Sequence, residues 1–195
     1  MRTAVTGTIG AGKSTLSILL RRRGYAVFDS DGYARMALNA NQPTAQKVIA
    51  AFGEGILDDF GEIDRKKLAA EVFGNEEKRQ TLNGIVHPFV KEGLEKFFAL
   101  HEDDHFVFAE VPLLFEAGWE NMFDHVIVVT CGHETAVQRM MEDRGYSREE
   151  AEARIASQIN AEEQIRRADT VFMNDGNFRD LDNKTAAWLK QYGEE

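Results

Sequence analysis

The residues with the clearest chemistry lie near the amino end, in the segment Gly7-Thr8-Ile9-Gly10-Ala11-Gly12-Lys13-Ser14. This segment fits the pattern G-x-x-x-x-G-K-[ST], in which glycines let successive backbone N–H groups turn toward one anion. The ammonium of Lys13 adds a full charge for the β- and γ-phosphates, and the hydroxyl of Ser14 can reach Mg²⁺. A plain glycine-rich turn is the alternative, but a short apolar strand before the segment and a helical pattern after it favour a phosphate loop. The segment therefore predicts binding of a nucleoside triphosphate.

Two carboxylates, Asp29 and Asp31, form a second group of candidate residues. They end an expected strand over residues 25–28, which a doubly wound sheet would place beside the phosphate loop. In an extended chain, alternation puts both side chains on the same side. One can accept a proton from a substrate hydroxyl while the other orients metal-bound water. Helix capping is the alternative role for either residue. The pair favours an enzyme, because a nucleotide-dependent switch needs no acceptor base.

Four arginines surround an expected corner between two helices: Arg139, Arg144, Arg148 and Arg154. Arginines on such a corner can close over nucleotide phosphates and stabilise the charge of the transition state. A solvated helix face is the alternative, and it fits Arg148 best because residues 147–150 form a capping box, S-x-x-E. The run of arginines at residues 21–23 indicates a helix end, where cations oppose the negative end of the dipole.

The elements that must position these residues follow from apolar runs and their spacing. Strands are expected at residues 2–6, 25–28, 106–111, 126–130 and 170–173, with helices between them. This alternation predicts an α/β fold with a mainly parallel five-stranded sheet and helices on both faces. Ligands of such sheets bind at the carboxyl ends of the strands, which here also hold Glu110 and Asn174.

Other segments give expectations about helices and core. Residues 32–101 contain no strong strand and indicate an inserted helical part, in which His87-Pro88 is expected to begin a helix. Leu113-Leu114-Phe115 is expected in the core, and contact with an apolar part of a substrate is the alternative. Around residues 134–144, helical spacing turns three side chains inward: Val137, Met140 and Met141.

Composition excludes several classes of protein. The 195 residues carry 23 Lys and Arg against 33 Asp and Glu, and a net charge of −10 disfavours a nucleic-acid partner. A single cysteine, Cys131, excludes an internal disulfide and any metal site with several cysteines. No apolar run approaches the roughly 20 residues of a membrane span, and no signal peptide is evident. We expect a cytoplasmic protein without a membrane partner, and the oligomeric state stays open.

The order and spacing of several segments resemble the dephospho-CoA kinase family, P-loop kinases that catalyse the last step of coenzyme A synthesis. The similarity runs from about residue 3 to residue 178, and the whole set is more specific than the phosphate loop, which many kinases share. Besides that loop, the segments are Phe28-Asp29-Ser30-Asp31, Asp64-Arg65-Lys66-Lys67-Leu68, His87-Pro88, Val111-Pro112-Leu113-Leu114-Phe115-Glu116, Gln138-Arg139, Arg154-Ile155-Ala156-Ser157-Gln158 and Asn174-Asp175-Gly176.

The resemblance implies a P-loop NTPase-type three-layer fold, with one kinase domain over residues 1–195. It also implies a CoA-binding helical insertion at about 32–101 and a mobile helical lid at about 139–158. The implied reaction is Mg²⁺-dependent transfer of the ATP γ-phosphate to the ribose 3′-hydroxyl of dephospho-CoA. The implied residues are Asp31 as the base, with Lys13 and Arg139, for catalysis; Gly10, Ala11, Gly12, Lys13, Ser14, Thr15 and Asn174 for ATP; Asp31, Arg65 and His87 for the acceptor; and Ser14 for Mg²⁺.

The chain departs from the family pattern at two informative places. Glu110 stands where the family commonly has Asp, and Glu142-Asp143-Arg144 reverses the usual Arg-Asp order. Two alternative functions remain. One is another small-molecule or nucleoside monophosphate kinase of the same architecture, which would phosphorylate a different acceptor. The other is a nucleotide-dependent switch, which would form a protein complex and have no small acceptor.

Overall fold

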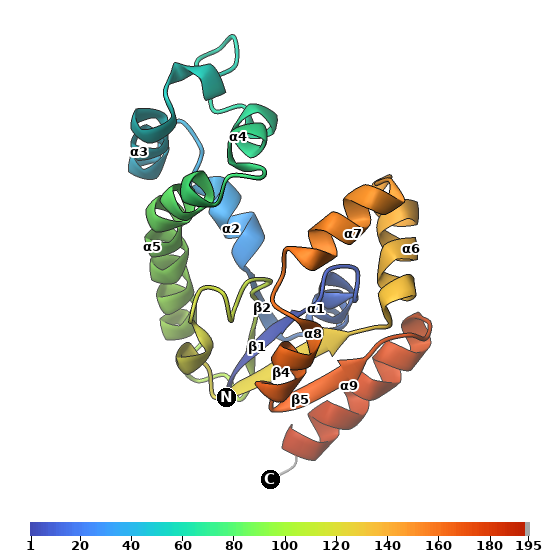
Figure 1. The fold of residues 1–195 in the computed structure, drawn as a ribbon. Helices are drawn as coiled ribbons and strands as arrows, with labels where there is room; N and C mark the ends of the chain where they lie inside the picture. The colour runs from blue at the N-terminus through green and yellow to red at the C-terminus, as the bar shows by residue number, and fades with distance from the viewer. Residues whose placement is uncertain (194–195) are drawn as a thin grey trace. The chain divides into compact units, whose positions relative to one another are not determined.

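The chain is described by a computed structural model that covers residues 1–193, and it divides into two compact units. The first unit combines Met1–Asp29 with the chain from His101 onward, and the second is Ser30–Leu100. Figure 1 shows the elements of both units. No helix within residues 1–193 is long and apolar enough to cross a membrane.

The first unit is built on a five-stranded sheet in which every pairing is parallel. Its order is β2-β3-β1-β4-β5. The strands are β1 (Arg2–Gly7), β2 (Ala26–Asp29), β3 (Val107–Glu110), β4 (His125–Thr130) and β5 (Thr170–Met173). The strands β3 and β4 are buried along their whole length, as expected for strands covered on both faces. The predicted α/β fold with a parallel sheet is confirmed.

The helices of the first unit are α1 (Lys13–Arg22), α6 (His133–Arg144), α7 (Arg148–Ala156), α8 (Ala161–Arg166) and α9 (Phe178–Gly193), with a short 3₁₀ turn, η2 (Glu120–Met122) (Figure 1). The main core joins apolar side chains of α1 and α9 to those of the strands. Its buried members include Leu16, Leu20, Phe108, Ile127, Leu181 and Trp188. Burial of these side chains fixes the end of β1 and the start of α1, between which the phosphate loop lies. Leu114 and Phe115 are buried as predicted, but Leu113 is 42% exposed, so its predicted place in the core is wrong.

A second apolar cluster joins α6 to α7. Val137 and Met140 of α6 pack with Ala151 of α7, and the partly buried Ile9 packs against them. Met141 is 40% exposed, so its predicted inward orientation is wrong. The spacing of three and four residues marks a helix face about 100° wide, and Met141 lies at the edge of that face.

The arginine run at the end of α1 is used within the fold. Arg21 donates to the carbonyl of Val27, and Arg23 pairs with Asp182 at 2.6 Å. Gly24 follows with φ +88°, the left-handed conformation that commonly ends a helix. This agrees with the interpretation of the run as a helix end.

The second unit contains four α-helices and a 3₁₀ turn: α2 (Ser30–Met36), α3 (Pro43–Phe52), η1 (Glu54–Ile56), α4 (Arg65–Val72) and α5 (Glu76–Leu100). Asp64 caps α4 by accepting from the backbone N–H groups of Lys66 and Lys67, and these hydrogen bonds lower the pKa of its carboxyl. Pro88 lies inside α5, so the prediction that His87-Pro88 begins a helix is wrong. The helix continues past the proline and forgoes the hydrogen bond that its missing N–H would make.

Candidate phosphate-binding site

The phosphate loop connects β1 to α1, and its backbone leaves donors for an anion. Gly12 begins α1 with φ +95°, and within residues 1–193 no side chain caps the helix and no acidic residue lies in its first turn. A Cβ at Gly12 would lie 2.6 Å from Nδ2 of Asn174, so a side chain does not fit there. The first N–H groups of an α-helix precede its intrahelical acceptors, so the start of α1 is suited to bind a phosphate.

Lys13 places its charge over the same loop. Its side chain is buried, and Nζ donates to the carbonyl oxygens of Gly7 and Thr8, both at 2.9 Å. The loop therefore holds the ammonium in a fixed position before any ligand is bound. A phosphate group that enters the loop meets a positive charge with little reorganisation.

Ser14 and Glu110 supply oxygen atoms beside the loop. The hydroxyl of Ser14 donates to Oε1 of Glu110 at 3.0 Å, and Glu110 is a buried residue at the end of β3, which pairs with β1. A hydroxyl and a carboxylate fit Mg²⁺, which takes few protein oxygens when nucleotide phosphates complete its shell. Residues 1–193 contain no cluster of three His, Cys, Asp or Glu side chains suited to a metal on their own.

Arg139 and Asn174 brace the loop from two other segments. Arg139 of α6 donates to the carbonyl oxygens of Gly10 at 3.4 Å and of Gly176 at 3.2 Å. Asn174, buried just after β5, donates from Nδ2 to the carbonyl of Ala11 at 2.8 Å. Sequence reasoning named both residues, and the structure brings both to the loop. The predicted contact of Asn174 with adenine stays a prediction.

Cys131 follows β4 beside the same loop. Burial raises the pKa of its thiol, with the nearby Arg139 acting in the opposite direction. Its Sγ lies 4.0 Å from the carbonyl of Gly10. The thiol is therefore a weak nucleophile at neutral pH, and the residue acts as a small packing group.

The acidic pair is arranged differently from the expectation. Asp29 is the last residue of β2, and the chain becomes helical at Ser30, so Asp31 lies in the first turn of α2. The prediction that alternation puts both carboxylates on the same side of an extended chain is therefore wrong. Asp29 belongs to the first unit and Asp31 to the second.

The predicted acceptor residues lie in the second unit with Asp31. Arg65 is the exposed first residue of α4, and His87 is half-buried within α5. Burial lowers the pKa of His87 below its ordinary value of 6.5, so the imidazole is neutral at pH 7. Their roles toward the acceptor stay predictions.

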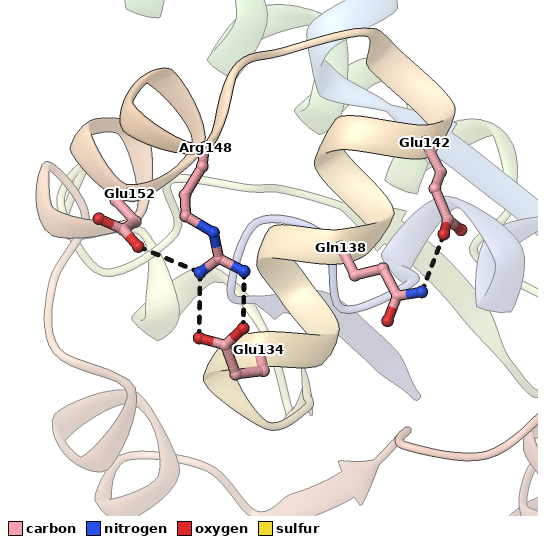
Figure 2. Close-up of polar contacts among 5 residues, drawn as sticks. All are labelled: Glu134, Gln138, Glu142, Arg148 and Glu152. Carbon is pink, nitrogen blue, oxygen red and sulfur yellow. Dashed lines mark hydrogen bonds and ion pairs between the residues drawn. The ribbon is translucent and has the colours of Figure 1, made fainter.

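The helices α6 and α7 are joined by an ion-pair cluster centred on Arg148 (Figure 2). Arg148 contacts both carboxylate oxygens of Glu134, at 2.9 and 3.2 Å, and Glu152 at 3.4 Å. The predicted capping box is present, with Ser147 and Glu150 each satisfying a backbone N–H of the other. Arg148 therefore lies on an exposed helix face, as the sequence interpretation of Arg148 as part of a solvated face predicted. Arg144 is the exposed last residue of α6.

Sequence comparison identifies relatives along nearly the whole chain. A family model described as dephospho-CoA kinase matches residues 1–180. A dephospho-CoA kinase from Geobacillus kaustophilus is 41% identical over 190 residues, which cover 96% of this chain and 94% of that protein. Another from Carboxydothermus hydrogenoformans is 40% identical over 190 residues, which cover 96% and 92%.

Solved structures agree with these matches. The crystal structure of TT1252 from Thermus thermophilus has a TM-score of 0.85 and 37% identity, covering 98% of this chain and 97% of that one. Dephospho-CoA kinase from Campylobacter jejuni has a TM-score of 0.66 and 29% identity, covering 98% and 96%. A shikimate kinase from Bacteroides thetaiotaomicron, at 15% identity and a TM-score of 0.55, shares the fold alone.

Proposed function

The chain belongs to the dephospho-CoA kinase family, and we propose how its residues transfer the γ-phosphate of ATP to the 3′-hydroxyl of dephospho-CoA. The products are CoA and ADP, and the proposal places the reaction in the cytoplasm. One observation carries the proposal. A phosphate loop with a preplaced lysine lies in a chain that matches this family over residues 1–180.

The loop binds the triphosphate through its backbone. The N–H groups at the start of α1 donate to phosphate oxygens, and Lys13 neutralises charge on the β- and γ-phosphates. Arg139 adds a second cation beside Gly10, where it can bind phosphate oxygens. Ser14 and Glu110 would hold Mg²⁺, which supplies charge neutralisation across the β- and γ-phosphates.

Asp31 is the proposed general base. The acceptor is an alcohol, whose proton must leave as the oxygen attacks phosphorus. A carboxylate within hydrogen-bond reach of that hydroxyl can accept the proton. Asp31 lies in the first turn of α2, near the positive end of the helix dipole.

Arg65 and His87 are the proposed acceptor-binding residues of the second unit. The guanidinium of Arg65 is suited to the pyrophosphate of dephospho-CoA, because its planar fork matches two phosphate oxygens. The neutral imidazole of His87 offers one donor and one acceptor. In this proposal, the helical part at about 32–101 binds the CoA moiety, and the segment at about 139–158 acts as a lid.

An acceptor screen tests the function. ADP release is followed with ATP, Mg²⁺ and dephospho-CoA, with CoA as the matched control because its 3′-hydroxyl is already phosphorylated. We expect turnover with dephospho-CoA and none with CoA, shikimate or nucleoside monophosphates. Turnover with another acceptor but not with dephospho-CoA would support a different small-molecule kinase. Slow hydrolysis and a nucleotide-dependent protein complex would support a switch.

A further inference from the structure

We infer that Gln158 is a positioning residue for the phosphate loop, and that it acts through the backbone N–H of Ile9. The inference rests on the proposed function, because the ligand of the loop is the phosphate chain of ATP. Gln158 follows α7 and is 149 residues away from Ile9 in sequence. Its Oε1 accepts from the Ile9 N–H at 2.7 Å, a short hydrogen bond for neutral partners.

This hydrogen bond acts on the peptide group that also holds Lys13. The N–H of Ile9 and the carbonyl of Thr8 belong to one planar unit and point in opposite directions. The Thr8 carbonyl accepts from Nζ of Lys13 at 2.9 Å and from the N–H of Ala11 at 3.3 Å. By fixing the N–H end of this peptide, Gln158 also fixes the direction of the oxygen that positions the ammonium.

Ile9 and Gly10 of the loop also pack against the helices α6 and α7. The side chain of Ile9 packs against the cluster that joins α6 to α7. Gly10 lies so close to α6 that a Cβ there would be 2.9 Å from the carbonyl oxygen of Ala136. The backbone and the side chain of Ile9 are therefore both held from outside the loop, and Gln158 supplies the polar contact.

Gln158 is itself held in place by its neighbours. The N–H of Ile159 donates to Glu116 at 3.2 Å, and the carbonyl of Ile159 accepts from Nε2 of Gln164 at 3.0 Å. Gln164 is 2% exposed, so this end of the segment is anchored in the protein interior. Because these contacts hold the chain directly after Gln158, its side chain loses little further freedom when it holds the loop.

The test compares Gln158→Met with Gln138→Met. The first variant keeps the approximate volume of the side chain and removes the oxygen acceptor. Gln138 is the matched control, because it lies exposed on α6 and donates to Glu142 at 2.8 Å (Figure 2). Binding of a non-hydrolysable ATP analogue is measured by calorimetry without acceptor, and hydrogen exchange of the Ile9 amide is measured on the unliganded protein.

We expect Gln158→Met to weaken binding of the analogue by about threefold to tenfold, which corresponds to the loss of one hydrogen bond. Exchange of the Ile9 amide should become faster, and KM for ATP should rise while KM for dephospho-CoA stays unchanged. Gln138→Met should leave all four quantities unchanged. A Gln158→Met protein that binds the analogue as tightly as Gln138→Met does would overturn the inference. So would a rise in both KM values together with faster exchange throughout the protein, because that pattern indicates general destabilisation.

The binding measurement separates this inference from the proposed function. It needs no acceptor, so a weakened analogue affinity supports the role of Gln158 even if the wild-type protein does not phosphorylate dephospho-CoA. Conversely, a wild-type protein that phosphorylates dephospho-CoA can still show that Gln158 is dispensable. If Gln158→Met does not fold, Gln158→Ala gives the same comparison against Gln138→Ala.

Discussion

Replacing Gly93 by alanine tests how α5 packs against α2, the helix that carries the proposed base Asp31. Gly93 is buried in α5, and a Cβ there would lie 2.2 Å from Cε1 and 2.4 Å from Cζ of Tyr33. Tyr33 belongs to α2, two residues after Asp31, and its ring centroid is 5.0 Å from that of Phe89. The missing side chain of Gly93 therefore lets the Tyr33 ring lie directly on the backbone of α5.

The same helix provides a matched control in Gly84, which has no atom within 4 Å of an added Cβ. Alanine favours a helix interior over glycine by about 0.8–1 kcal/mol, so Gly84→Ala should leave stability unchanged or raise it. Gly93→Ala gains the same preference but must displace the Tyr33 ring, and overpacking a core costs about 1–3 kcal/mol. The two variants should therefore differ by about 1–3 kcal/mol, or roughly 2–12 °C in Tm.

Thermal unfolding and steady-state kinetics check this prediction. We expect Gly93→Ala to melt below Gly84→Ala and to have a lower kcat, because displacement of Tyr33 moves α2 and with it Asp31. ATP affinity should not change, since the phosphate loop belongs to the other unit. In the background of Tyr33→Ala, the extra cost of Gly93→Ala should disappear, because the clashing ring is gone. Equal melting temperatures for the two glycine variants would refute the reasoning.

Three further predictions address the metal ligands, the ion-pair cluster and pH. Glu110→Gln should raise the Mg²⁺ concentration for half-maximal activity by roughly tenfold or more, and an unchanged requirement in a Mg²⁺ titration would count against this ligand. Arg148→Ala should change kcat and KM for ATP by less than about twofold, because its ion pairs are exposed; a large loss of kcat would place Arg148 at the nucleotide. Burial lowers the pKa of His125 below 6.5, so the unfolded chain binds more protons and stability should fall as pH drops below about 6.5. His125→Asn should flatten this dependence in urea unfolding at several pH values, and an unchanged slope would contradict the assignment.

The phosphate loop and the sheet could be predicted because their signals are local. Four fixed residue types within eight positions define the loop, and apolar runs buried on both faces define strands such as residues 126–130. The second expected strand was correct to within one residue, but its continuation through Ser30 was wrong. A polar sequence such as Ser30-Asp31 can end a strand or begin a helix, and packing within the second unit decides between them.

Two further contacts of the loop, those of Gln158 and Glu110, could not be predicted, because they join residues far apart in sequence. Gln158 contacts Ile9 across 149 positions, and Glu110 contacts Ser14 across 96. Glu110 carried a partial signal, since it ends a strand that a parallel sheet places near the loop. Gln158 belongs to a segment that carries the family resemblance, but its residue type did not indicate a contact with the loop, because a glutamine after a helix is most often solvated.

The role of Asp31 is the central claim, and one kinetic comparison tests it most directly. Asp31→Asn and Asp29→Asn are assayed with saturating ATP, Mg²⁺ and dephospho-CoA, and ATP affinity is measured separately for both. We expect Asp31→Asn to keep its ATP affinity and to lose about 10²- to 10⁴-fold in kcat, a larger loss than that of Asp29→Asn. A folded Asp31→Asn protein with nearly normal kcat would contradict the account.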